Sequence, residues 1–174
     1  MTITERKTFV ITSGYYNPLH VGHVRYLNQA RELGDVHIAI INNDAQVRLK
    51  GNVPFMSEQE RLEILSALKA VDIAVLSLDT DRTVCSTIMK VVGEFSQEGV
   101  KWVFAKGGDR VERNIPEKKI CRDLGIELAF NIGGDKIQSS SALIRKAQGN
   151  EFFIGVRRGG PPTRRSPRYL RDQR

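Results

Sequence analysis

Short apolar runs alternate with longer amphipathic segments along the first 150 residues of the chain. The apolar runs predict buried strands at residues 7–13, 36–41, 73–78, 101–105 and 127–131. Apolar positions three and four residues apart predict helices at residues 20–33, 57–68, 83–95, 116–124 and 140–148. Strands that alternate with helices predict an α/β fold, a Rossmann-like doubly wound sheet of about five parallel strands with helices on both faces.

The residues that punctuate this pattern support the predicted boundaries. Gly34 ends the first predicted helix, and Ser57 with Glu60 forms the capping box that begins the second. The apolar run 36–41 is typical of a strand covered on both faces, although it contains His37. We therefore expect His37 to be a hydrogen-bonded interior or sheet-edge histidine and not a catalytic group.

Length and composition fit one globular domain, expected over residues 1–150. The chain has 174 residues, of which 40% are hydrophobic and 27% are charged. Its N-terminus lacks the apolar run of a signal peptide, and no apolar stretch approaches the length of a membrane span. Cys85 and Cys121 lie far apart and are expected to be core thiols, which argues against a disulfide framework and a structural zinc site. We expect a cytoplasmic protein.

The net charge of +7 is concentrated near the C-terminus. Residues 151–174 hold seven arginines and two acidic residues, and therefore carry +5 of that charge. Such a tail is either a nucleic-acid-binding arm or an appendage that packs on the body or aids solubility. Tyr169 is the aromatic residue interspersed among these arginines, which is little support for base stacking. We therefore do not expect nucleic acid as a partner.

The sequence His20-Val21-Gly22-His23 stands where the first predicted strand turns into the first predicted helix. A helix N-terminus offers unpaired backbone N–H groups and the positive end of the helix dipole to an anion. Gly22 keeps the surface between the two imidazoles clear. The spacing therefore predicts a polyphosphate site with a histidine on each side.

Three further turns reach the same edge of the predicted sheet, because ligands of doubly wound sheets bind beyond the carboxyl ends of the strands. The segment 106–109 (Lys-Gly-Gly-Asp) allows a close backbone approach to a ligand, although it could be an ordinary turn. Ser139, Ser140 and Ser141 precede Arg145 at the start of the last helix, where they could form a second phosphate site or cap the helix. The segment 42–44 (Asn-Asn-Asp) could contact a substrate or form a turn.

These motifs, taken in order, resemble the cytidylyltransferase-like nucleotidyltransferase superfamily with its His-x-Gly-His signature. The chain is most similar to the adenylyltransferase domain of ADP-heptose synthases, and then to glycerol-3-phosphate cytidylyltransferases. The resemblance covers most of residues 7–148, and the matching segments are 14–23, 30–35, 48–51, 60–61, 67–72, 106–109 and 139–145.

The resemblance implies that a phosphomonoester oxygen attacks the α-phosphate of ATP or CTP and releases pyrophosphate without a covalent enzyme intermediate. It implies His20, His23 and Lys50 as catalytic residues, and Mg²⁺ bound through the triphosphate with no direct protein ligand. It also implies a homodimer or a larger oligomer. The implied nucleotide-binding residues are Ser13, Gly14, Tyr15, Asn17, Gly22, Lys106, Gly107, Gly108, Asp109, Ser139, Ser140, Ser141 and Arg145, and the implied substrate-binding residues are Asn42, Asp44 and Arg61.

The chain departs from the closest branches of this family in two places. Asn17 stands where the closest relatives usually have aspartate, so that an amide would bind phosphate or backbone there. The arginine that precedes the serine helix in the glycerol-phosphate enzymes is absent, and residues 133–136 (Gly-Gly-Asp-Lys) occupy that region. The chain also lacks the kinase half that is often fused to heptose adenylyltransferases. These departures leave the acceptor and the choice between ATP and CTP open.

The leading expectation is transfer of AMP or CMP to a small phosphorylated sugar or polyol. Adenylyltransferases of phosphopantetheine or nicotinamide mononucleotide share the histidine motif and a serine-led final helix, and are the alternative enzymes. A non-catalytic nucleotide-binding protein whose basic tail binds nucleic acid is the alternative outside catalysis. A class I aminoacyl-tRNA synthetase fragment is disfavoured, because the chain is short and has no Lys-Met-Ser-Lys-Ser loop.

Overall fold

The computed structural model describes residues 7–96, 99–108, 115–134 and 138–151. Its strands form one parallel sheet, which confirms the predicted doubly wound α/β fold. The strands are β1 (Thr8–Gly14), β2 (Val36–Ile41), β3 (Ile73–Leu76), β4 (Lys101–Gly107) and β5 (Glu127–Ile132), in the order β3-β2-β1-β4-β5. The first and fourth strands therefore lie side by side at the centre of the sheet.

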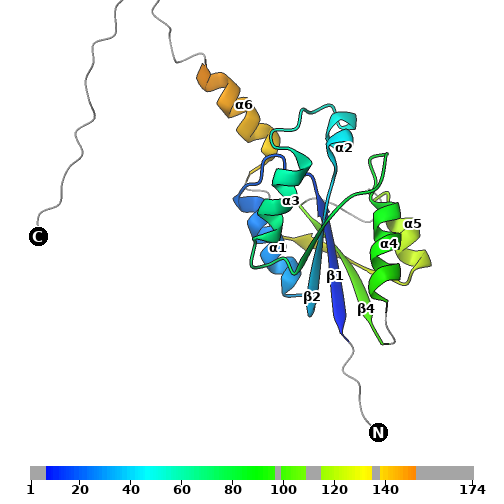
Figure 1. Ribbon diagram of the computed structural model, residues 1–174. Helices are drawn as coiled ribbons and strands as arrows, with labels where there is room; N and C mark the ends of the chain where they lie inside the picture. The colour runs from blue at the N-terminus through cyan, green and yellow to red at the C-terminus, as the bar shows by residue number, and fades with distance from the viewer. Residues whose placement is uncertain (1–6, 97–98, 109–114, 135–137, 152–174) are drawn as a thin grey trace, which may run out of the picture.

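Helices cover both faces of this sheet (Figure 1). They are α1 (Val21–Arg31), α2 (Asp44–Leu49), α3 (Glu58–Ser66), α4 (Cys85–Phe95), α5 (Lys118–Asp123) and α6 (Ser140–Glu151). On one face, Leu27 of α1 and Leu65 of α3 pack with Ile41 of β2. On the other face, Ile88 of α4 and Cys121 of α5 belong to a second apolar cluster. None of the described helices is both long and apolar enough to cross a membrane.

Strand β1 is apolar at successive positions because its two faces are buried in different clusters. Phe9 and Ile11 point to the cluster under α4 and α5. Val10 packs with Ala30 of α1 on the opposite face. Burial on both faces explains why the first strand could be recognised as a continuous apolar run.

His37 is an interior histidine, as predicted. It is buried in β2, where its ring nitrogens lie 2.8 Å from Thr12 Oγ1 and 2.5 Å from the carbonyl oxygen of Ala70. Burial lowers its pKa, so the ring is neutral near pH 7. Both ring nitrogens have partners inside the protein, and His37 therefore has a structural role.

The two cysteines are free thiols on the side of the sheet covered by α4 and α5. Cys121 is fully buried, as expected for a core thiol, and burial raises its pKa to about 12. Cys85, at the start of α4, is half-buried, and burial raises its pKa as well. Neither thiol has the depressed pKa of a reactive cysteine.

The structure differs from the predicted elements mainly around α2. This helix of six residues follows β2, in a stretch where the sequence analysis predicted no helix. Asn43 caps it by accepting a hydrogen bond from the N–H of Gln46, whose side chain bonds back to the N–H of Asn43. Further along, the predicted strand 73–78 ends at Leu76, and the helix predicted from residue 83 begins at Cys85, because Thr83 instead bonds the carboxylate of Asp81.

Candidate active site

A cleft of about 990 Å³ opens at the edge of the sheet where β1, β2, β4 and β5 end. It lies between the first turns of α1 and α6, and it reaches past the end of β4 to the residues just before α4 and α5. The predicted site residues that line it are Ser13, Gly14, Tyr15, Asn17, His20, Gly22, His23, Asn42, Lys50, Lys106, Gly107, Gly108, Ser139, Ser140, Ser141 and Arg145. One cleft therefore holds both the histidine motif and the serine-led helix. Asp109 lies outside the described residues.

The imidazoles of His20 and His23 stack on each other at the start of α1. Their centroids are 3.8 Å apart and their planes differ by 21°. His20 is the N-cap residue, and its Nδ1 accepts a hydrogen bond of 3.1 Å from the N–H of Gly22. Nδ1 of His23 accepts from the N–H of His20 at 3.3 Å. Because both Nδ1 atoms are acceptors, each neutral ring carries its proton on Nε2.

Both imidazoles are neutral near pH 7. Burial lowers the pKa of His20. Burial lowers the pKa of His23 to about 3, and proximity to His20 and Lys50 contributes in the same direction because each would repel a protonated His23 ring when it is itself charged. The site therefore offers two uncharged Nε2–H donors whose tautomers are set by the backbone.

Small residues and an aromatic ring fix the position of this pair. A Cβ atom on Gly22 would lie 3.0 Å from both Cε1 and Nδ1 of His20, so only glycine fits without moving the ring. Tyr16, which is buried, packs the edge of its ring against His23 with centroids 5.0 Å apart. A Cβ atom on Gly14 would meet the Tyr16 ring at 2.8 Å. The sequence analysis missed Tyr16, because its contact with His23 arises only in the fold.

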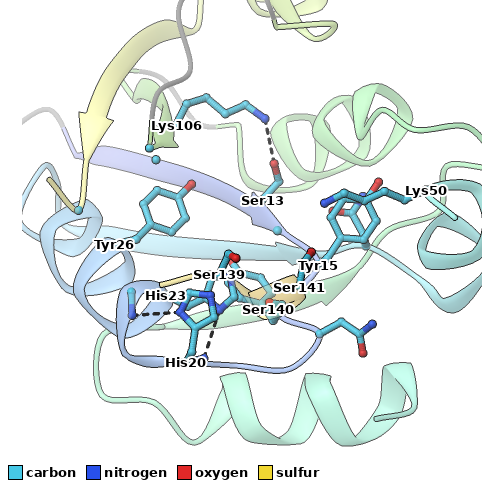
Figure 2. Close-up of a pocket in the computed structure, with 18 of the residues that line it drawn as sticks. Ser13, Tyr15, His20, His23, Tyr26, Lys50, Lys106, Ser139, Ser140 and Ser141 are labelled. Atoms are coloured by element: carbon cyan, nitrogen blue, oxygen red, sulfur yellow. Dashed lines mark hydrogen bonds between the residues drawn. The ribbon is translucent and has the colours of Figure 1, made fainter. Parts of the chain in front are cut away.

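Figure 2 shows the two imidazoles beside Ser139, Ser140 and Ser141. Ser139 caps α6, since its Oγ accepts a hydrogen bond of 3.2 Å from the N–H of Ala142. The hydroxyl of Ser140 donates to the carbonyl oxygen of Pro18 at 2.9 Å and so ties α6 to the turn before the histidines. Ser141 lines the cleft and is exposed. Two of the three hydroxyls thus have local structural roles, while the first turn of α6 still faces the cleft.

Two lysines line the cleft from different elements (Figure 2). Lys50 follows α2, and its ammonium lies 4.3 Å from the centroid of the Tyr15 ring. Lys106, in β4, donates a hydrogen bond of 3.1 Å to Ser13 Oγ and lies 3.3 Å from a carboxylate oxygen of Glu117. The cleft therefore combines neutral histidine donors with cations, which suits a polyanionic ligand.

Comparison with known proteins identifies the family. The model of the cytidylyltransferase-like family matches residues 11–169 of the chain. The chain belongs to the cytidylyltransferase-like family. It is accordingly an enzyme of the nucleotidyltransferase class.

Relatives of this cytidylyltransferase-like chain include two bifunctional proteins HldE. The chain is 46% identical over 144 residues to HldE of Citrifermentans bemidjiense, across 80% of this chain and 27% of that protein. It is 38% identical over 132 residues to HldE of Syntrophotalea carbinolica, across 74% of this chain and 25% of that protein. The chain thus spans about a quarter of the length of these relatives.

A solved structure shares the fold of this cytidylyltransferase-like chain. It is the crystal structure of the lipopolysaccharide core biosynthesis protein from Thermoplasma volcanium, with a TM-score of 0.54 and 27% sequence identity. The match covers 72% of this chain and 94% of that chain. It supports the family assignment at the level of the whole fold.

The prediction that Arg61 binds the substrate phosphate is wrong. Arg61 is 1% exposed and does not line the cleft. Its guanidinium donates to the carbonyl oxygens of Tyr15 and Asn42, each at 2.7 Å, and pairs with Asp44 at 2.5 Å. The same ion pair engages the carboxylate of Asp44, which was predicted to bind substrate and also lies outside the cleft lining. Both residues hold the backbone around the site in place.

The side chain of Asn17 also has a structural role, although it borders the cleft. Its amide donates to the carbonyl oxygen of Val53 at 2.9 Å and accepts from the N–H of Phe55 at 2.5 Å. The Asn17 amide was predicted to bind the nucleotide, but it instead binds the backbone of residues 53 and 55. Asn42 is buried and donates to Gln46 Oε1 at 3.0 Å, so its predicted contact with substrate is not supported by its hydrogen bonds.

The cleft also contains residues that sequence reasoning missed. Arg82 lines it, and the guanidinium Nε and Nη2 both donate to the carbonyl oxygen of Leu49. Glu117 lines the same end of the cleft. Tyr26 also lines the cleft, and its hydroxyl donates to the carbonyl oxygen of Ala105 at 2.7 Å. Arg82 and Glu117 lie far from the histidine motif in the sequence, whereas Tyr26 follows His23 by three residues on α1, a spacing that was a readable signal.

Proposed function

We propose that this enzyme transfers AMP or CMP from a nucleoside triphosphate to a small phosphorylated sugar or polyol and releases pyrophosphate. The observation that carries the proposal is the stacked pair of His20 and His23. Their Nε2–H donors have a fixed tautomer, and they share a cleft with the first turn of α6. The volume of about 990 Å³ is at the upper end of the range for small-molecule sites.

In this reaction, an oxygen of the acceptor phosphate forms a bond to the α-phosphorus while the bond from that phosphorus to the bridging oxygen of pyrophosphate breaks. Negative charge develops on the oxygens around the α-phosphorus, and pyrophosphate leaves with the electrons of the broken bond. The two Nε2–H groups would stabilise this charge without any change in their own protonation. No side chain needs to act as a nucleophile.

The remaining polar groups of the cleft would position the two anions. The N–H groups and serines at the start of α6, together with Arg145, would hold the β- and γ-phosphates. Lys50 and Lys106 would contact the non-bridging oxygens of the triphosphate. Mg²⁺ would arrive as part of the triphosphate substrate. Within the described residues, no group of three or more His, Cys, Asp or Glu side chains could hold a metal ion.

The acceptor would bind near the ends of β2 and α2. Arg82 lines this part of the cleft, and its guanidinium bonds the residue immediately before Lys50. Arg82 is therefore placed to bind the acceptor phosphate, in the role that the sequence had predicted for Arg61. The relatives named bifunctional protein HldE align with 132 and 144 residues. The resemblance to ADP-heptose synthases supports a phosphorylated sugar among the candidate acceptors.

Pyrophosphate release tests the proposal. The assay pairs each nucleoside triphosphate and Mg²⁺ with a panel of sugar phosphates, polyol phosphates, phosphopantetheine and nicotinamide mononucleotide. The substitution His20→Ala is expected to lower kcat by about 100- to 1000-fold, because one preorganised donor is lost. Lys119→Ala is the matched control, since its side chain is 80% exposed on α5. An absence of turnover with every pair would refute catalysis of this kind, and equal rates for wild type and His20→Ala would refute the role of the histidine pair.

A further inference from the structure

A buried ion pair forms part of the cleft wall where β4 meets the start of α5. Oε2 of Glu117 lies 3.3 Å from Nζ of Lys106, and the two side chains are 5% and 14% exposed. Both residues line the cleft. A buried charge is costly unless it is paired, so the two groups depend on each other.

The ammonium of Lys106 is held by groups from three elements. Besides Glu117, it donates a hydrogen bond of 3.1 Å to Ser13 Oγ, at the end of β1. It also lies 4.2 Å from the centroid of the Phe104 ring, which belongs to β4 itself. Because β1 and β4 are neighbours at the centre of the sheet, the charge is fixed above the junction of the two central strands. A lysine side chain without such contacts would sample many rotamers.

The carboxylate of Glu117 is almost fully buried although it belongs to the cleft lining. Oε1 accepts a hydrogen bond of 3.3 Å from the N–H of Val84. Oε2 is buried and has no hydrogen-bond partner among the described residues, which leaves Lys106 as its charged neighbour. Lys106 is therefore the cleft cation through which this carboxylate can act on a bound anion.

We propose that Glu117 is a positioning residue that fixes the ammonium of Lys106 at the centre of the cleft, where it meets the triphosphate during transfer. The inference rests on the proposed function. A cation that is already in place needs no reorganisation when charge develops in the transition state. Glu117 also offsets part of the charge of Lys106, so it does not strengthen binding of the triphosphate in the ground state. It therefore acts on kcat and not on affinity.

The substitution Glu117→Gln removes the charge but keeps the size and an oxygen that can accept from Val84. We expect kcat to fall about 10- to 100-fold, as for other losses of orientation, without a rise in KM for the triphosphate. Glu127→Gln is the matched control, because Glu127 pairs with Lys101 on the exposed end of the sheet, and kcat should not change there. An unchanged kcat in Glu117→Gln, or a fall in kcat together with a rise in KM, would overturn the proposal.

A double-mutant cycle separates positioning from a general structural effect. Lys106→Met removes the charge that Glu117 is proposed to hold. The double variant Lys106→Met with Glu117→Gln should be no slower than Lys106→Met alone, because Glu117 has nothing left to position. If the two losses in kcat multiply instead, then Glu117 acts independently of Lys106 and the proposal is wrong.

A second support of Lys106 keeps the proposal testable if Glu117→Gln lowers the thermal midpoint. Ser13→Ala removes the hydrogen bond from Lys106 to Ser13 and leaves α5 untouched. It should lower kcat without raising KM for the triphosphate, and an unchanged kcat would count against fixed positioning of Lys106.

Chemical labelling distinguishes this proposal from the proposed function. If the wild type releases no pyrophosphate with any substrate pair, then the proposed function fails. The positioning of Lys106 can still be tested, because mass spectrometry measures how fast its ammonium group reacts with an amine reagent. Glu117→Gln should accelerate labelling at Lys106 relative to Lys119, whose side chain is 80% exposed. Equal labelling rates at Lys106 in both proteins would overturn the positioning role.

Discussion

Arg61 connects α3 to the ends of β1 and β2 through its guanidinium. It satisfies the carbonyl oxygens of Tyr15 and Asn42 and the carboxylate of Asp44, and it is almost fully buried. These carbonyl groups belong to the segments that line the cleft. Arg61 was predicted from the sequence to bind the substrate phosphate, and it instead stabilises the backbone around the site.

The substitution Arg61→Ala is expected to destabilise the protein by about 3–5 kcal/mol, because it leaves a partly buried carboxylate and two carbonyl groups without their partner. Urea denaturation would measure this loss. Lys69→Ala is the control, since the side chain of Lys69 is exposed. A variant that unfolds like the wild type but requires more acceptor for half-maximal rate would instead restore Arg61 as a phosphate ligand.

Gly22 sets the geometry of the histidine pair from within α1. Gly22→Ala would bring a Cβ atom to 3.0 Å from the His20 ring, so the ring must move. Because the ring must give by a few tenths of an ångström, and a displacement of 1 Å costs about 100-fold in rate, we expect kcat to fall by less than about 100-fold with little loss of stability. Gly93→Ala, in α4, is the control, because a Cβ atom there meets nothing within 4 Å. Steady-state kinetics that do not distinguish the two variants would contradict this account.

At the scale of elements, α2 depends on one buried side chain. Gln46 is fully buried, and its amide donates to the carbonyl oxygens of Asp81 and Thr83 while it accepts from Asn42 and Asn43. It thereby joins α2, which precedes Lys50, to the loop that carries Arg82.

Gln46→Ala should lower the free energy of unfolding by about 1–3 kcal/mol, because buried donors and acceptors lose their partners. It should also raise KM for the acceptor more than KM for the triphosphate, since the loop that carries Arg82 loses two hydrogen bonds and Arg82 is proposed to bind the acceptor. Gln59→Ala on the exposed side of α3 is the control, with an expected change within about 0.5 kcal/mol. Chemical denaturation and initial rates supply both readouts, and an equal rise in the two KM values would speak against a local effect.

The helices and strands that could be predicted from sequence are those long enough to show a periodic pattern of apolar residues. Strands such as β2 and helices such as α1 follow directly from their apolar positions. The helix α2 has six residues and too few apolar positions for a period, although the pair Asn43 and Gln46 was a readable capping signal. Helix α3 was predicted because Ser57 and Glu60 form a capping box before a longer pattern.

The candidate site was predictable where one segment supplies both the chemistry and its position. His20, Gly22 and His23 lie within one turn of helix, so their mutual geometry is local. The burial of Arg61 and the pairing of Lys106 with Glu117 were not predictable, because they depend on strands and helices that meet only in the folded sheet.

At the scale of the whole molecule, every histidine of the chain is described and each has a lowered pKa, with burial as the largest cause. The folded state therefore resists protonation of its imidazoles, whereas the unfolded chain takes up protons near pH 6.5. The unfolded state then binds more protons, so stability is complete above that pH and is lost as the pH falls below it.

The free energy of unfolding should therefore decrease between about pH 6.5 and pH 5, by up to about 1.4 kcal/mol per pH unit for each fully buried histidine. Urea denaturation at a series of pH values measures this slope. His23→Gln should have a shallower slope than the wild type, because the His23 pKa lies at about 3 in the folded protein. Parallel slopes for the two proteins would show that His23 is not protected from protonation.

The hydrogen bond between Ser140 and Pro18 joins two walls that are 122 residues apart in the chain. The histidine turn is synthesised before β4, which pairs with β1, and before residues 138 onward, which form the opposite wall of the cleft. A nascent chain therefore displays its histidines long before it can enclose a nucleotide between them and α6. The ability to bind a nucleotide is therefore acquired late in the synthesis of this domain, after the strands of the sheet have been made.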